Sequence, residues 1–267
     1  MKSIVIAVTN QKGGVGKTTT AVNLAVFLNE LHHRTLLIDV DPQVNSSDTY
    51  RAKIFGEPTL YDLLLEDGPI TEELVKETIQ HTDFGDIIPG DPNLTEADDA
   101  LYNVSDRYFT LKNLLEKIDG FTNYDYIILD TNPSLNTLLK CALCSANWAI
   151  LPCKPTRYAV QGMATLSSTL VGAQQEYNPE LKVAGILPVD FDGRANVYRD
   201  TLGNLEDVAK KMGTSVFSVA IRRSSIVDAA QDQRMPLLKY APKSKPALDY
   251  REFGKELLTI LGGENDG

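Results

Sequence analysis

The chain has 267 residues, 43% of them hydrophobic and 23% charged, which is typical of a globular protein with a sizeable core. Its formal net charge of −10 argues against a surface that traps nucleic acid over its whole extent. No run of about 18 apolar residues could span a bilayer, and the short apolar start is typical of a strand rather than a signal peptide, so we expect a cytoplasmic location.

Short apolar runs rich in β-branched residues alternate with helical patterns along the chain. Strands are predicted at 3–9, 34–40, 86–90, 124–131, 148–153 and 183–190. Helices are predicted at 18–31, 59–66, 107–118, 135–145, 160–177, 195–211 and 246–261. This alternation predicts an α/β fold with a mostly parallel twisted sheet and helices on both faces. Because no linker or repeat interrupts it, we expect a single domain over residues 1–262 and a loose tail at 263–267.

The first predicted strand leads through a glycine-rich loop into the first predicted helix, in "VTNQKGGVGKTTTAVNL" at residues 8–24. Gly13, Gly14 and Gly16 allow backbone N–H groups to point at an anion. The N-terminal end of the helix adds positive potential at the same place. The loop therefore predicts a site for a polyphosphate.

The side chains of this loop extend the prediction. Lys17 is expected to reach the β- and γ-phosphates of a nucleotide, and the Thr18 hydroxyl to ligate Mg²⁺. The usual phosphate-loop pattern has a glycine where this chain has Gln11, and it lacks the extra lysine, Lys12, that follows. A single phosphate site with two lysines requires a separate explanation for the second one.

Two further predicted strands end in carboxylates. In "LLIDVDPQ", Asp39 and Asp41 are two residues apart and point the same way from the pleat. In "YDYIILDTNPS", Asp130 follows four apolar residues, which is the Walker B arrangement that holds Mg²⁺ through its water shell. Ligands of open α/β sheets bind at the carboxyl ends of strands, so all three carboxylates are expected beside the phosphate loop.

Together, "KGGVGKTT", "LLIDVDPQ" and "YDYIILDTNPS" resemble the motifs of the ParA/MinD group of deviant Walker A ATPases, which are P-loop NTPases of the SIMIBI class. The resemblance covers nearly the whole chain. It implies that ATP and Mg²⁺ are bound and that two subunits form a homodimer around sandwiched nucleotides. Lys17 would then serve its own nucleotide and Lys12 the phosphates of the partner's ATP. A side chain at Gly13, where the two loops approach, should block pairing.

The same resemblance implies the role of each site residue. Asp41 would orient or activate the attacking water, so the expected catalytic residues are Lys12, Lys17 and Asp41. The expected magnesium ligands are Thr18, Asp39 and Asp130. The expected nucleotide-binding residues are Lys12, Gly13, Gly14, Val15, Gly16, Lys17, Thr18 and Thr19, with Thr19 beside the α-phosphate. Adenine is expected between the loop after "GILPVD" and residues 221–224, and ATP hydrolysis is expected to be slow and accelerated by a partner.

Longer matches indicate the ParA branch of the group. "DPQVNSS", "LPCKPTRYAVQGM" and "PLLKYAPKSKPALDYREFGKEL" resemble ParA segments. The resemblance implies a DNA-partitioning ATPase whose ATP dimer binds DNA nonspecifically and is released when a ParB-like centromere-binding protein stimulates hydrolysis. The chain closes on an acidic segment rather than the basic amphipathic helix of the MinD branch, so no membrane contact is expected.

Basic residues are concentrated in the C-terminal third. Residues 182–255 hold 13 Lys and Arg against 9 acidic residues, whereas residues 57–130 hold 18 acidic residues against 4 basic ones. Such asymmetry is often only solvated surface. The side chains expected to contact DNA are Arg222, Arg223, Arg234, Lys243 and Lys245, with Lys239 as a further candidate.

Three positions depart from the family pattern. Ile226 and Ala229 stand where a basic residue and a glutamate are common, and Asn132 stands where a proline is usual. A second hypothesis therefore stays open, in which a ParA-like cargo-positioning or regulatory switch acts through protein partners rather than DNA. A third is a metabolic P-loop enzyme whose substrate occupies the dimer cleft.

The three cysteines are Cys141, Cys144 and Cys153. The first two face one side of an apolar predicted helix, which favours buried packing. A metal or cluster shared across a dimer is the alternative, although a four-ligand site would need further ligands nearby.

Overall fold

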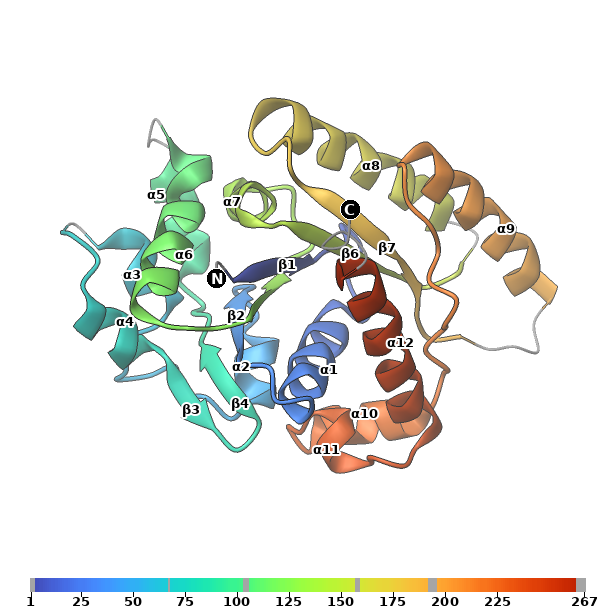
Figure 1. The fold of residues 1–267 in the computed structure, drawn as a ribbon, viewed down its shortest axis with the longest axis horizontal. Coiled ribbons are helices and arrows are strands. Elements are labelled where there is room, and N and C mark those ends of the chain that lie inside the picture. The colour runs from blue at the N-terminus through green and yellow to red at the C-terminus, as the bar shows by residue number, and fades with distance from the viewer. Residues whose placement is uncertain (1–2, 67, 103–105, 157–158, 192–195, 263–267) are drawn as a thin grey trace.

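The computed structural model describes residues 3–66, 68–102, 106–156, 159–191 and 196–262. Within these ranges seven strands form one sheet in the order β3-β4-β2-β5-β1-β6-β7 (Figure 1). All neighbouring strands run parallel except β3 and β4, which are antiparallel. The strands are β1 (Ile4–Val8), β2 (Thr35–Val40), β3 (Gln80–Thr82), β4 (Gly85–Ile88), β5 (Tyr126–Thr131), β6 (Trp148–Cys153) and β7 (Lys182–Pro188).

Helices cover both faces of this sheet (Figure 1). One face packs against α1 (Lys17–Glu30), α10 (Ser225–Asp232), α11 (Leu237–Tyr240) and α12 (Lys245–Gly262). The other packs against α3 (Leu60–Leu65), α4 (Glu72–Thr78), α5 (Leu94–Tyr102), α6 (Thr110–Phe121), α7 (Thr137–Ser145), α8 (Ala159–Glu176) and α9 (Asn196–Lys211). The short helix α2 (Asn45–Thr49) follows β2, and the 3₁₀ turn η1 (Arg107–Phe109) precedes α6.

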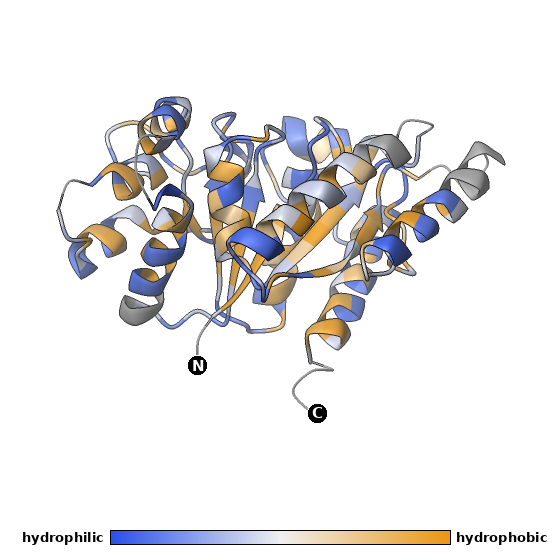
Figure 2. Ribbon diagram, turned by 90° about the horizontal axis from the view of Figure 1, so that it is seen from above, coloured by the Kyte–Doolittle hydropathy of each residue, from blue (hydrophilic) through white to orange (hydrophobic). Residues whose placement is uncertain are grey.

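The alternation of side chains along the strands divides the core into two layers. Val5 and Ala7 of β1 pack with the α3–α9 layer, whereas Ile6 and Val8 pack with α1 and α12. Strands that bury both faces must be apolar at nearly every position, and Figure 2 shows the strands as a hydrophobic centre between helices with hydrophilic outer faces. The predicted α/β fold with a mostly parallel sheet is therefore confirmed.

The six predicted strands are present, although the one at 86–90 spans Gly85–Ile88. The prediction missed β3 and five short helices, and the helix predicted from residue 107 begins as a 3₁₀ turn. These elements have at most nine residues, and an apolar pattern that short does not by itself identify a helix or a strand. The missed helices are α2, α4, α5, α10 and α11. The tail predicted at 263–267 and residue 195 lie outside the described residues.

Two other predictions concern the burial of the cysteines and the membrane. Cys141 and Cys153 are buried as free thiols in the α3–α9 layer, and Cys144 of α7 is also buried and free. Burial raises the pKa of the Cys141 thiol to about 12, which keeps it in the neutral, packing form. In the described part of the chain, no helix has the length and apolarity needed to cross a bilayer.

The C-terminal end of α1 carries a residue in the left-handed region. His32 has φ of 64°, its N–H bonds the Asn29 carbonyl at 3.0 Å, and the His33 N–H bonds the Leu28 carbonyl at 3.1 Å. This is a Schellman motif, in which glycine is preferred at the left-handed position. The motif after α9 has Gly213, with φ of 68°, at that position.

Replacing His32 with glycine should therefore stabilise the protein by about 0.5–1 kcal/mol, because it relieves the left-handed strain of a residue with a Cβ atom. Urea unfolding should show this gain, and thermal unfolding a rise of about 1–3 °C. Gly213→Ala is the matched control and should shift stability in the opposite direction. A destabilised His32→Gly variant would contradict the argument.

Candidate functional site

The phosphate loop lies at the carboxyl edge of the sheet, where the order places β1 between β5 and β6. Gly14 and Gly16 have φ of 69° and 78°, conformations in which a side chain is strained, and Gly16 caps the start of α1. The Asn10 side chain donates to the Pro152 carbonyl at 2.7 Å and accepts from the Lys12 N–H at 3.0 Å. These bonds anchor the loop at the N-terminal end of α1, the end of a helix that favours anions.

Gln11, where the usual pattern has glycine, serves as an anchor. Its Nε2 donates to the Thr169 hydroxyl of α8 at 2.9 Å. The side chain thus connects the loop to the opposite helical layer. Val15 is buried below the loop, and the exposed Gly13 has no described atom within 4 Å of a Cβ built on it.

The two lysines of the loop have different environments. Lys17 is 7% exposed, and its Nζ lies 3.4 Å from the carbonyl oxygen of Lys12. Burial lowers the pKa of Lys17, while the charges of Asp130 and Asp41 raise it. The Lys12 side chain is exposed. One lysine therefore faces this subunit's own cavity, and the other is accessible from outside.

Asp39 and Asp130 are register partners on the adjacent strands β2 and β5, and both are fully buried. Burial and the neighbouring Asp130 carboxylate raise the pKa of Asp39 to about 7. Burial also raises the pKa of Asp130 to about 6, against hydrogen bonds from Ser46 and Thr18 that lower it. Two carboxylates held together in a dry site disfavour their shared ionised state.

Two serines of α2 complete this arrangement. Ser47 donates to Asp39 Oδ2 from its N–H at 2.9 Å and from its hydroxyl at 2.7 Å. The Ser46 hydroxyl donates to Asp130 Oδ2 at 2.6 Å. Asp130 Oδ1 is buried and has no hydrogen-bond partner within the described part of the chain. Asp130 Oδ1 can therefore still accept a hydrogen bond or a positive charge.

These residues fit Mg²⁺. Carboxylate and hydroxyl oxygens are the ligands that Mg²⁺ prefers, and Thr18, Asp39 and Asp130 supply them around an orphaned oxygen. No group of three or more His, Cys, Asp or Glu suited to a metal is found among the described residues. Magnesium commonly takes its other ligands from water and substrate phosphates, so a small protein set is sufficient.

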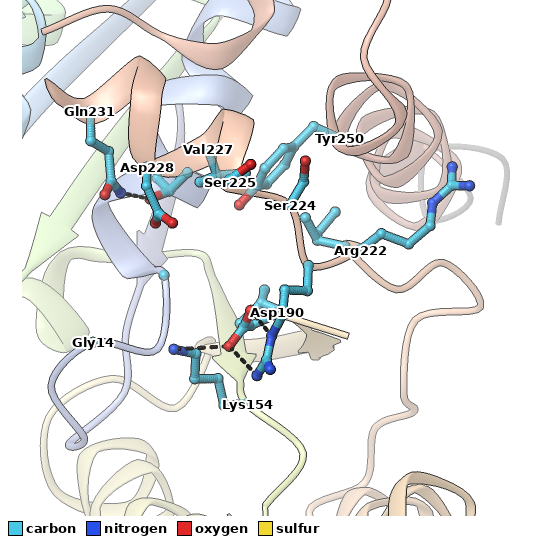
Figure 3. Close-up of a pocket in the computed structure, with 15 residues that line it drawn as sticks. Gly14, Lys154, Asp190, Arg222, Ser224, Ser225, Val227, Asp228, Gln231 and Tyr250 are labelled. Carbon is cyan, nitrogen blue, oxygen red and sulfur yellow. Dashed lines mark hydrogen bonds and ion pairs between the residues drawn. The ribbon is translucent and has the colours of Figure 1, made fainter. Parts of the chain in front are cut away.

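Two cavities open onto the loop. The phosphate cavity, of about 430 Å³, is lined by Gly13, Gly14, Gly16, Lys17, Thr18, Thr19 and Asp41 among others. The second, of about 610 Å³, extends from Gly14 and Gly16 to Val189, Asp190 and residues 221–225 (Figure 3). Asp190 accepts there from Lys154 Nζ at 3.0 Å and Arg223 Nε at 2.8 Å. The structure thus brings the phosphate loop, Asp41 and the loops predicted to hold adenine around two cavities whose linings share Gly14, Gly16, Thr19 and Gln231.

Three of the predicted DNA contacts are engaged inside the subunit. Arg222 Nε bonds Asp249 at 2.8 Å, Arg223 bonds Asp190, and Arg234 Nε lies 3.2 Å from Asp48. Lys243 and Lys245 are exposed. The further candidate Lys239 lies 3.4 Å from Glu30.

Sequence reasoning missed Ser46, Ser47, Gly90 and Val44. A Cβ at Gly90 would lie 2.9 Å from the Asp39 carbonyl, and the Gly90 N–H donates to the Ser47 hydroxyl at 2.9 Å. The segment "DPQVNSS" resembles the ParA sequence "DPQGNAT". That resemblance indicated that the segment belongs to the site, but it did not predict these contacts. Val44 stands at the glycine of that pattern with φ of 51°, a strained conformation for a β-branched residue.

Comparisons with known proteins agree with this geometry. A family model described as an AAA domain matches residues 3–183. The chain is 37% identical over 257 residues to the chromosome partitioning protein ParA of Myxococcus xanthus, covering 95% of this chain and 87% of that protein. It is 34% identical over 254 residues to the sporulation initiation inhibitor protein Soj of Bacillus subtilis, covering 95% and 97%.

A solved structure is similar in fold as well as in sequence. It is that of cobyrinic acid a,c-diamide synthase from Mycobacterium smegmatis, with bound ATP analog and magnesium. The TM-score is 0.82 at 32% identity, with 98% of this chain and 97% of that chain covered.

The carboxylate pair predicts a pH-dependent variant effect. Both carboxyl groups have a higher pKa in the folded protein than in the unfolded chain, where it is about 4. The free energy of unfolding that this pair contributes is therefore lost as pH rises from about 4 through the pKa values of the folded state. Asp130→Asn removes the charge and keeps an acceptor for Ser46, so it should stabilise metal-free protein by about 1–3 kcal/mol at pH 8 and by little at pH 5. Urea unfolding in the presence of a chelator at pH 5 and pH 8 measures these changes in the free energy of unfolding. The exposed Asp83→Asn is the control, and its change should be the same at both pH values.

Val44→Gly should stabilise the ligand-free protein by about 1 kcal/mol, because it removes left-handed strain of a β-branched residue at the cost of some packing. Val44→Ala should lie between the two, since it removes only the branching. Thermal unfolding of the three proteins gives the order. A loss of stability in Val44→Gly would show that Val44 packing outweighs the strain.

Proposed function

This chain belongs to the ParA/MinD family of P-loop ATPases, and from that membership we propose that it is an ATP-dependent DNA-partitioning ATPase. The observation that supports this most directly is the contrast between its two loop lysines. Lys17 is buried beside Asp41 and Asp130, whereas Lys12 is exposed on the same loop. A site with one inward and one outward lysine suits a triphosphate shared between two subunits.

In this proposal ATP occupies both cavities, with its phosphates at Lys17 and its base beside Asp190 and residues 221–224. Magnesium, held by Thr18, Asp39 and Asp130, neutralises charge on the β- and γ-phosphates when bound. Asp41 lines the phosphate cavity, and its Oδ1 accepts from the Gln43 N–H at 3.0 Å. That bond orients the carboxylate, so Asp41 can hold the attacking water.

The nucleotide also controls assembly. The γ-phosphate concentrates negative charge at the subunit boundary, where the partner's exposed lysine, equivalent to Lys12, neutralises it. Hydrolysis removes part of that charge and weakens the pairing. We propose that the ATP homodimer binds DNA nonspecifically, and that a ParB-like protein accelerates otherwise slow hydrolysis and so releases it.

A second candidate is a cargo-positioning or regulatory switch that uses the same dimer to bind a protein partner. The engagement of Arg222, Arg223 and Arg234 with carboxylates favours it, because those charges are partly neutralised within the subunit. Lys243 and Lys245 are the other two residues predicted to contact DNA, and both are exposed.

Light scattering of purified variants tests the assembly step. Asp41→Ala with Mg·ATP should be a dimer, and Lys17→Ala a monomer that has lost nucleotide binding. Lys12→Ala should keep Mg·ADP affinity within about threefold but raise the dimer dissociation constant about 100-fold or more, since one charge-assisted contact is lost at each of the two sandwiched nucleotides. Gly13→Val should fold normally but should not form the homodimer. Lys76→Ala removes another exposed lysine and is the matched control for Lys12→Ala. A monomeric Asp41→Ala protein at saturating Mg·ATP would refute the proposal.

DNA binding separates the two candidates. A partitioning ATPase predicts DNA retention by Asp41→Ala only with Mg·ATP, with affinity falling steeply as salt is raised. Lys243→Ala together with Lys245→Ala removes four lysines from each homodimer and should reduce its salt slope by about 4. Dimerisation without nucleotide-dependent DNA binding would instead favour the switch.

A further inference from the structure

The two cavities meet at a glutamine that neither the phosphate loop nor the Walker B strand contains. Gln231, near the C-terminal end of α10, lines both the phosphate cavity and the larger one. Its Nε2 donates to the hydroxyl of Thr19, in the first turn of α1, at 2.8 Å (Figure 3). A ligand that fills both cavities must pass this pair.

Gln231 belongs to a turn that is anchored on the other side of the phosphate cavity. Arg51, which follows α2, donates to the carbonyl oxygens of Gln233 and Arg234 at 3.4 and 3.3 Å. Arg234 in turn pairs with Asp48, a residue that lines the phosphate cavity. These contacts hold the end of α10 against α2, so Gln231 is presented to Thr19 from a fixed position.

The direction of this hydrogen bond determines what Thr19 can do. A threonine hydroxyl has one hydrogen to donate and two lone pairs. Because the amide N–H of Gln231 occupies one lone pair, the hydroxyl hydrogen must point elsewhere. Thr19 lies at the positive end of α1, beside the cavity predicted to hold phosphates. Its hydroxyl is therefore free to donate to an anionic oxygen there.

We propose that Gln231 is a nucleotide-positioning residue, which orients the Thr19 hydroxyl toward the phosphate nearest the nucleoside. This inference rests on the proposed function, because it requires a nucleotide in both cavities. The neutral amide is suited to the place, since a carboxylate there would accept the Thr19 hydrogen and repel the phosphates. Gln231 thus links the placement of α10 to the nucleotide.

Titration calorimetry with Mg·ADP tests the inference. Gln231→Leu should weaken binding about fivefold, as expected for loss of one oriented hydrogen bond. Gln231→Glu should weaken it more than tenfold, and added salt should reduce that loss by screening the charge. Gln233→Leu, an exposed glutamine two residues away, is the control and should bind as the wild type does.

A double-mutant cycle distinguishes positioning from a separate contact. Thr19→Val removes the hydroxyl, and adding Gln231→Leu to it should cost little more, because Gln231 acts through Thr19. Additive losses, an unchanged affinity in Gln231→Leu, or a lowered Tm of that variant without nucleotide would each overturn the inference. Failure of the wild-type protein to bind Mg·ADP would overturn the proposed function and this inference together.

Discussion

The repulsion between Asp39 and Asp130 is the constraint on which the rest of the site depends. The register of β2 and β5 places these carboxylates side by side at the sheet edge, without access to water. Ser46, Ser47 and Thr18 each donate to one of them, and Lys17 lies close enough to be affected by Asp130. One carboxylate oxygen is still left without a partner in the described chain. Further positive charge would relieve this repulsion, and the Mg²⁺ ion that accompanies a nucleotide would supply it.

The surrounding fold explains why a nucleotide would bind beside this pair in a defined orientation. The strand order brings the loop after β1 between the ends of β5 and β6, and the two cavities extend from it in different directions. Asn10 and Gln11 bind the loop to β6 and α8, so its N–H groups are held before any ligand is present. A preorganised anion site loses little free energy to ordering when the ligand binds.

The parts of this arrangement that the sequence predicts are those encoded locally. The phosphate loop, the six predicted strands and the major helices follow from residues close together in the chain. Contacts between distant residues were not predictable: Gln231 and Thr19 are 212 positions apart, and Ser46 reaches Asp130 across 84. The ion pairs of Arg222, Arg223 and Arg234 were missed for the same reason, since no pattern near an arginine reveals its carboxylate. Short helices such as α2 and α10 depend on these tertiary contacts more than on propensity.

Strain and repulsion at this site make the ligand-free protein less stable than its core alone would allow. Val44 holds a left-handed conformation beside the serines, and the buried carboxylates oppose ionisation at neutral pH. A ligand that binds only the folded state at a hundred times its dissociation constant stabilises it by about 2.7 kcal/mol. This stabilisation by a ligand is comparable to the free energy that strain and repulsion cost at the site. The bound and free forms therefore differ in local stability as well as in occupancy. Because α2 and the end of α10 both border the phosphate cavity and are joined through Arg51 and Arg234, their local stability should rise together when a nucleotide binds.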